Sequence, residues 1–198
     1  MLIEFGLDYE MRPIESRSGE TRTEEFLALN PRHKIPVLQH RELVLAESYA
    51  IITHLSESFK APDDFFVPRD PARRAKLNEW CSFIMMELDA LSLYVIRRHL
   101  DLADEYGAAP NVIDAAKEYF TEQTNALFED VVTGHDYLLP EGMSVADILL
   151  MTVVDSALRR NIVVPEFLVG YLRRGMDRPA YHRAFEINYS DRSFDPMG

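Results

Sequence analysis

Cysteine is almost absent from this chain, because Cys81 is the only one among 198 residues. A single cysteine permits no internal disulfide and excludes CxxC redox motifs and cysteine-rich zinc sites. Long hydrophobic runs are missing as well, since the run from Ile148 to Val154 is far too short to span a bilayer. The first residues show no basic stretch followed by an apolar one, so no signal peptide is expected. These absences predict a cytoplasmic protein that is not a membrane protein.

Positive charge is also scarce. Lysine and arginine total 21 against 33 aspartates and glutamates, which gives a formal net charge of -12. A surface of this sign repels phosphate backbones, and no basic stripe relieves it, so nucleic acid is not an expected partner. Hydrophobic residues make up 47% of the chain and charged residues 27%, the balance of an ordinary globular protein. A chain of this length buries about 70% of its unfolded surface, enough to hold a core without disulfides.

The first sixty residues mix short strand and helix patterns. Alternating or continuous apolar residues between turn residues predict strands, and apolar residues three or four apart predict helices. In chain order the patterns predict a strand over 9–15, a helix over 23–29, a hairpin from 36–40 and 43–46, and a helix over 48–59. The first of these helices should end at Asn30, because a residue before proline disfavours the helical region.

Beyond residue 60 the pattern becomes helical throughout. Residues 61–70 are rich in proline and aspartate and predict a linker. The patterns after it predict long helices over 71–100 and 112–132, a helix opening at Ser144, and short helices opening at Pro165 and Pro179. The fold class is therefore α+β, with a mixed domain over 1–60 and an all-helical domain over 71–198.

The helix at Ser144 opens with a capping-box pattern, in which Asp147 stands three residues after the capping serine. We interpret this pair as structural. Replacing either residue by alanine is predicted to cost about 0.5–2 kcal/mol of stability.

Several motifs together resemble the glutathione S-transferase superfamily. The N-terminal part of the resemblance is the run Asn30-Pro31-Arg32-His33-Lys34-Ile35-Pro36-Val37-Leu38 followed by Glu47-Ser48. The helical part is Arg74-Ala75 ahead of Trp80, then Ser144-Val-Ala-Asp147-Ile148, then Arg178-Pro-Ala-Tyr181. These pieces keep the family's order and spacing along nearly the whole chain. The resemblance implies a thioredoxin-like N-terminal domain, an all-α helical bundle and a homodimer.

The resemblance also implies a site for glutathione, which would be a co-substrate, with no tightly bound cofactor and no metal. Ser48 at a helix start would hold the γ-glutamyl carboxylate, since free N–H groups and the helix dipole favour an anion. Glu47 would orient the site or meet the ammonium. The residue matching Ile35 pairs its backbone with the cysteinyl amide, ahead of a cis Pro36, and Lys34 could reach the glycyl carboxylate.

Each of these residues also has a plainer interpretation. Ser48 can be only a helix cap, Lys34 a solvated loop lysine, and Pro36 a trans proline that begins a strand. Cys81 is best interpreted as a small buried hydrophobe rather than a nucleophile.

An electrophile pocket is predicted on the long helix. Met86, Tyr94 and Arg97 are its candidate residues. Methionine at helical spacing is more often core, and a basic cluster near a helix end already favours the negative end of the dipole.

The chain departs from the family pattern at its beginning. The family starts with a strand, a turn carrying a catalytic Tyr, Ser or Cys, and a helix, whereas the first residues here match only the end of that helix and the strand after it. The catalytic residue is therefore unknown, with His33 and Tyr49 the first places to look. A strand over 9–15 would also have no neighbour, and unpaired backbone groups are costly when buried.

Two classes of function follow from these observations. The first is a glutathione S-transferase-like enzyme that joins glutathione or a related thiol to a small electrophile, with carbon–sulfur chemistry on another thiol as a variant. The second is a non-catalytic binding or scaffold protein that keeps the fold. The Lys34-Ile35-Pro36 and Glu47-Ser48 motifs favour the transferase, and the missing first strand favours the scaffold.

Overall fold

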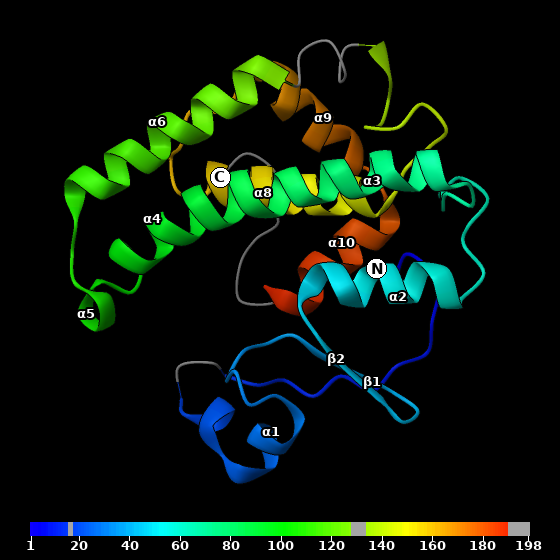
Figure 1. The fold of residues 1–198 in the computed structure, drawn as a ribbon, viewed down its shortest axis with the longest axis horizontal. Helices are drawn as coiled ribbons and strands as arrows, with labels where there is room; N and C mark the ends of the chain where they lie inside the picture. The colour runs from blue at the N-terminus through cyan, green and yellow to red at the C-terminus, as the bar shows by residue number, and fades with distance from the viewer. Residues whose placement is uncertain (16–17, 128–133, 190–198) are drawn as a thin grey trace. The chain divides into compact units, whose positions relative to one another are not determined.

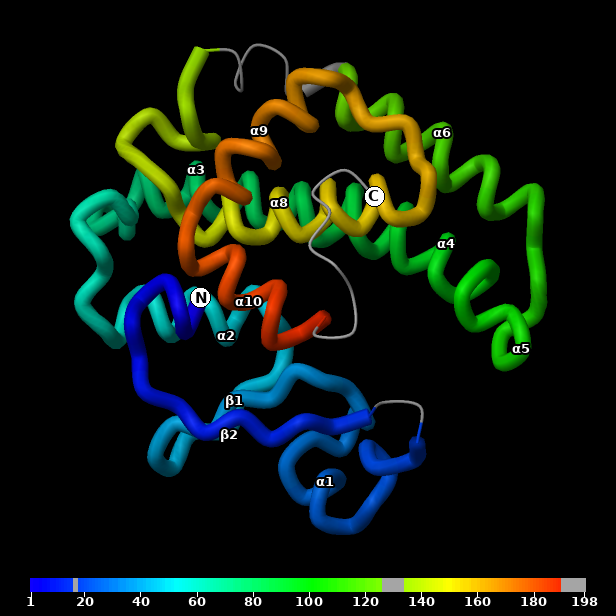
Figure 2. Tube along the Cα trace, turned by 180° about the vertical axis from the view of Figure 1, so that it is seen from behind, coloured from blue at the N-terminus to red at the C-terminus, as the bar shows by residue number. Residues whose placement is uncertain are grey.

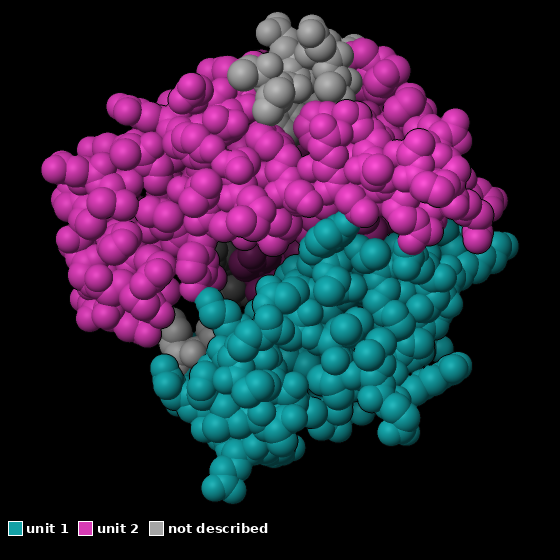
Figure 3. Space-filling view, in the orientation of Figure 1, with its two compact units in different colours: residues 1–62 teal, residues 63–198 magenta. Residues whose placement is uncertain are grey.

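The computed structural model describes residues 1–15, 18–127 and 134–189. The chain divides into two compact units, residues 1–62 and 63–198, which Figure 3 shows in teal and magenta. The boundary lies within the proline- and aspartate-rich stretch 61–70.

The first unit contains the two helices and the hairpin that the sequence predicts, together with a short 3-10 helix that it does not predict. They are η1 (Glu20–Arg22), α1 (Glu24–Leu29), β1 (Val37–His40), β2 (Leu43–Ala46) and α2 (Ser48–Ser58), shown in Figure 1. The Thr23 hydroxyl caps α1 by accepting a hydrogen bond from the Phe26 amide at 3.2 Å. Arg41 has a positive φ of 57° in the short turn between the two antiparallel strands. Helix α1 ends at Leu29, directly before Asn30-Pro31, as predicted.

The strand predicted over 9–15 does not form. Among the described residues the sheet has only two strands, β1 and β2. Residues 9–15 form hydrogen-bonded strand pairs with neither of them. Figure 2 shows this stretch as part of the blue trace after the N-terminus. Six of its seven residues are exposed, with Ile14 half-buried. Water can therefore satisfy its backbone groups, which explains why an extended stretch without strand partners is tolerated here.

The second unit is helical. Its elements are α3 (Pro71–Phe83), η2 (Ile84–Leu93), α4 (Tyr94–His99), α5 (Ala103–Tyr106), α6 (Pro110–Leu127), α8 (Val145–Leu158), α9 (Glu166–Met176) and α10 (Pro179–Asn188). The first three follow one another without a break and form the long helix that the sequence predicts, with η2 a π-helical middle part (Figure 1). The end of the predicted second long helix, 128–132, lies outside the described residues.

Proline and aspartate mark the helix starts as expected. The Asp70 carboxylate accepts a hydrogen bond from the Arg73 amide at 3.0 Å and caps α3, whose first residue is Pro71. Pro165 is the N-cap residue of α9, and Pro179 is the first residue of α10. A proline at the first helical position loses no hydrogen bond, because its missing N–H would have no partner within the helix.

Helix α8 forms the centre of the helical unit. Nine of its fourteen residues are buried, and it packs against η2, α3 and α9. A helix that is apolar on nearly all sides must be covered on nearly all sides. Helix α6 packs on η2 and α4 and inserts the fully buried Phe120. Within the described residues, no helix has both the length and the hydropathy that a membrane crossing needs.

Candidate functional site

The register of the hairpin brings the two N-terminal motifs together. Val37 pairs with Ala46 as the outermost pair of β1 and β2. Residues 35 and 36 immediately precede this pair, and residues 47 and 48 immediately follow it, so both motifs lie at the same end of the hairpin. The Ile35–Pro36 peptide bond is cis and Ser48 is the first residue of α2, both as predicted.

The loop before the hairpin is held by Asn30, which is 2% exposed. Its side-chain amide donates a hydrogen bond to the Lys34 carbonyl at 2.7 Å, and its side-chain oxygen accepts one from the Arg32 amide at 3.1 Å. His33 adopts a positive φ of 56°, and its Nδ1 lies 3.2 Å from the Thr21 carbonyl. The sequence identifies Asn30 only as a helix stop and as the first residue of the N-terminal motif. Its second role, fixing the loop that presents Ile35, follows from hydrogen bonds that the sequence does not reveal.

The start of α2 is a polar and accessible helix N-terminus. Glu47 is the N-cap residue, with a positive φ of 73°, and its carbonyl accepts a hydrogen bond from the Ile51 amide at 3.0 Å. Its carboxylate pairs with the Arg32 guanidinium at 2.8 Å. The first N–H groups of any helix lack an acceptor within the helix, so such an end can bind an anion. Ser48 is half-buried, and Ile35 is 45% exposed.

Arg32 is a residue that sequence reasoning did not select. Its pairing with Glu47 neutralises a carboxylate that would otherwise stand at the positive end of α2 and repel a second anion. The only sequence signal was a basic residue inside the motif. Lys34 and Pro36 are exposed on the same loop.

The three predicted electrophile residues all lie on the long helix. Met86 is 58% exposed on η2, Tyr94 is half-buried at the start of α4, and Arg97 is exposed in its last turn. Their role stays a prediction. The neighbouring basic residues have local contacts, since the Arg98 guanidinium lies 4.4 Å from the centre of the Tyr106 ring and His99 Nδ1 lies 2.8 Å from the Gly107 carbonyl oxygen.

Ser144 and Asp147 form the capping box at the start of α8, and both are completely buried. The Asp147 carboxylate accepts hydrogen bonds from the Ser144 amide and hydroxyl, each at 2.7 Å, and from the Leu138 amide at 2.8 Å. It also accepts the hydroxyl of Tyr171, which is buried on α9. Burial raises the pKa of Asp147, and the hydrogen bonds that it accepts oppose that rise. The capping box that the sequence predicts is present, and Asp147 also joins α8 to α9 and to the loop before it.

Cys81 is fully buried within α3. Its burial agrees with the interpretation of this cysteine as a small hydrophobe of the core.

Comparison with known proteins identifies the class that this fold and site define. Residues 1–57 match the family profile described as the glutathione S-transferase, N-terminal domain. The chain is 31% identical over 147 residues to glutathione S-transferase 1 of Dianthus caryophyllus, an alignment covering 73% of this chain and 64% of that protein. It is 30% identical over 154 residues to glutathione S-transferase D7 of Drosophila melanogaster, an alignment covering 76% of this chain and 64% of that protein.

Solved structures show the same fold. A glutathione transferase homolog from Lodderomyces elongisporus, crystallised with two GSH per subunit, has a TM-score of 0.82 at 24% identity and covers 94% of this chain and 90% of its own. The glutathione transferase URE2P6 from Phanerochaete chrysosporium, in complex with oxidized glutathione, has a TM-score of 0.83 at 19% identity. The match covers 96% of this chain and 89% of that one.

The chain belongs to the glutathione S-transferase superfamily. Its N-terminal unit is thioredoxin-like and its C-terminal unit is the family's helical domain. The chain spans less than two thirds of the length of the two relatives aligned above, 64% of each.

Proposed function

We propose that this protein binds glutathione, or a closely related thiol peptide, and joins its sulfur to a small electrophile. The observation that carries the proposal is the hairpin register, which brings the cis Ile35–Pro36 bond and the Glu47-Ser48 helix start to one end of β1 and β2. Relatives crystallised with glutathione or oxidized glutathione support the choice of ligand.

Each part of the thiol peptide has a chemically matched group in the proposed site. The γ-glutamyl carboxylate meets the Ser48 hydroxyl and the free N–H groups at the start of α2. The exposed backbone of Ile35 takes the cysteinyl amide. Glu47 meets the ammonium, and Lys34 reaches the glycyl carboxylate.

In the transfer itself, the sulfur loses its proton and attacks the electrophilic carbon, and the leaving group departs with its electron pair. The protein contributes by binding both the thiol peptide and the electrophile, which removes much of the entropic cost of bringing two reactants together. We place the electrophile at Met86, Tyr94 and Arg97, where methionine, an aromatic ring and a cation offer an adaptable apolar surface with one charged edge.

Replacing Ser48 by alanine is expected to weaken glutathione binding about tenfold, because a hydrogen bond to a carboxylate contributes about 1.5 kcal/mol. Isothermal titration calorimetry of the two proteins checks this. Ser58→Ala is the matched control, since Ser58 is the last residue of the same helix. Equal affinities for the two variants would remove Ser48 from the site.

A non-catalytic scaffold is the second candidate, favoured by the extended stretch 9–15 that pairs with neither β1 nor β2. It predicts that glutathione neither binds nor reacts, so the calorimetric titration of the unaltered protein separates the two candidates.

We also propose that the protein is a two-fold homodimer, with α3, η2, α4 and α6 near an interface of more than about 1,000 Å². Light scattering at micromolar concentration should give twice the 22.8 kDa of the chain. A mass of one chain would contradict the dimer.

A further inference from the structure

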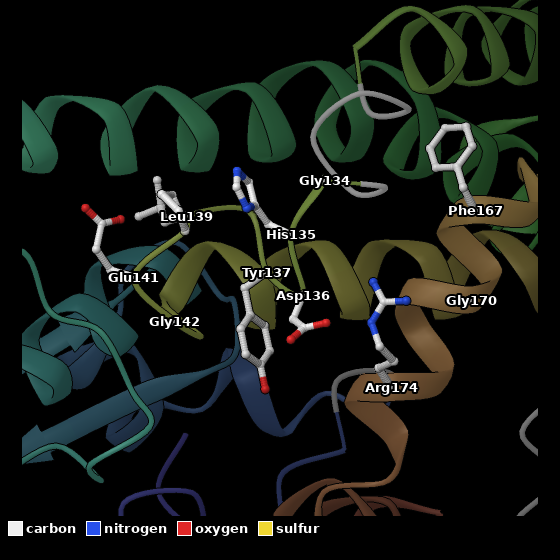
Figure 4. A pocket seen from close by; sticks show the side chains of 11 residues that line it. Gly134, His135, Asp136, Tyr137, Leu139, Glu141, Gly142, Phe167, Gly170 and Arg174 are labelled. Carbon is white, nitrogen blue, oxygen red and sulfur yellow. The ribbon is translucent and has the colours of Figure 1, made fainter.

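A hollow of about 730 Å³ opens in the helical unit between the loop 134–142 and helix α9 (Figure 4). Pockets of 300–1,000 Å³ are typical of small-molecule sites. Its lining includes Asp136, Tyr137, Phe167, Gly170 and Arg174. The hollow contains none of the residues assigned above to the thiol peptide or to the electrophile.

The loop that forms one wall of the hollow is tied to the helices. The Leu138 amide donates a hydrogen bond to the Asp147 carboxylate at 2.8 Å. The Glu141 carboxylate forms an ion pair with the Arg73 guanidinium at 2.8 Å. The Tyr137 hydroxyl accepts a hydrogen bond from the Arg178 guanidinium at 3.3 Å. Three attachments along five residues hold this wall in place before any ligand arrives, which lowers the entropy that binding must remove.

Gly170 is the observation that points to a ligand. It lies in the middle of α9, where glycine costs about 1 kcal/mol relative to alanine. A Cβ on Gly170 would meet nothing within 4 Å, and its φ is not positive. On the same helix, a Cβ on Gly175 would lie 2.2 Å from the Met151 sulfur, so close packing explains that glycine. Neither packing nor backbone conformation explains Gly170, whereas leaving the floor of the hollow open does.

Arg174 supplies the charge. In Figure 4 its side chain extends from α9 toward the loop that carries Asp136. Its guanidinium lies 5.6 Å from the centre of the Tyr171 ring, and within the described residues it takes part in no ion pair. The adjacent Arg173 instead pairs with Glu166 at 3.6 Å. A guanidinium that is held by a ring and not by a carboxylate can bind a planar anion through two parallel hydrogen bonds.

We propose that this hollow binds a small aromatic carboxylate that also carries a hydrogen-bond donor. The carboxylate pairs with Arg174, and the flat ring lies over Gly170 beside Phe167. Asp136 would repel a second negative charge, so the opposite edge of the ring must present a donor, which Asp136 or the Tyr137 oxygen accepts. Bulky, non-planar or doubly anionic molecules fit this lining poorly.

The test is a titration with 4-hydroxybenzoate, using 4-hydroxybenzamide as its uncharged partner. A ligand of this size should bind with a dissociation constant that is roughly millimolar or tighter. The amide should bind about tenfold more weakly, because it lacks the charge that pairs with Arg174. Ligand-observed NMR measures both in the same protein sample.

Three variants and a matched control locate the binding. Gly170→Leu fills the floor of the hollow with a better helix former and should abolish binding without lowering the thermal midpoint. Arg174→Gln should remove the difference between the two ligands, while Arg173→Gln, one residue away, should keep it. Ser48→Ala should leave binding unchanged.

The proposal is overturned if the unaltered protein does not bind 4-hydroxybenzoate at millimolar concentration. It is also overturned if Gly170→Leu binds normally, if Arg174→Gln behaves like Arg173→Gln, or if Ser48→Ala is the variant that loses binding. The last result would place the ligand at the thiol-peptide site.

Discussion

Asp147→Ala should lower the free energy of unfolding by about 3–5 kcal/mol, more than the capping box alone implies. The reason is the number of donors that lose their acceptor. The Leu138 amide, both Ser144 donors and the Tyr171 hydroxyl bind this carboxylate in a buried site. Each buried donor left without a partner costs about 1–3 kcal/mol. Urea denaturation followed by circular dichroism measures the change.

The companion variants divide this effect into its parts. Ser144→Ala should cost about 1–2 kcal/mol and Tyr171→Phe about the same, because each removes one partner and leaves the carboxylate with the others. Thr152→Ala, on the exposed side of the same helix, should change stability by less than about 0.5 kcal/mol. If Asp147→Ala costs no more than Thr152→Ala, the network does not stabilise the folded protein.

Extending the chain at its N-terminus with the family's strand and hydroxyl-bearing turn should raise the rate of conjugation at least about tenfold. By the family resemblance, the group that stabilises the thiolate belongs to that turn. A thiol with a pKa near 9 is only about a few per cent thiolate at neutral pH, and lowering its pKa by one unit raises that fraction about tenfold.

Initial rates at pH 6.5 with a generic electrophile compare the two proteins where the thiolate fraction limits the reaction. A third protein, extended by the same strand with alanine in place of the hydroxyl residue, separates chemical activation from a gain in folding. If the shorter protein is already as fast as the extended one, the activating group is elsewhere, and Tyr49→Phe and His33→Gln are the next variants to assay.

Local chemistry explains why most of the fold could be predicted from the sequence. Asn30-Pro31 ends α1, Asp70-Pro71 begins α3, and the polar residues between two apolar runs make the hairpin turn. Each depends on residues within a few positions of one another, and such signals are visible in a sequence.

The features that were missed depend on distant residues. Tyr171 is 24 positions from the Asp147 that it contacts, and nothing in either neighbourhood indicates the pair. Arg32 and Glu47 meet only because the hairpin folds back. The stretch 9–15 alternates like a strand, yet a strand is stabilised by its neighbours, and neither β1 nor β2 pairs with it. Gly170 becomes informative only when the space around it is known.

The most direct test of the proposed function is a titration of the 15N-labelled protein with reduced glutathione, followed by amide chemical shifts. We expect the largest changes at Ile35, Glu47 and Ser48, which the hairpin register brings to one end of β1 and β2. Amides at the other end of α2, near Ser58, should stay in place. Unchanged shifts at these three residues with saturating glutathione, or changes confined to other parts of the chain, would contradict the proposed function.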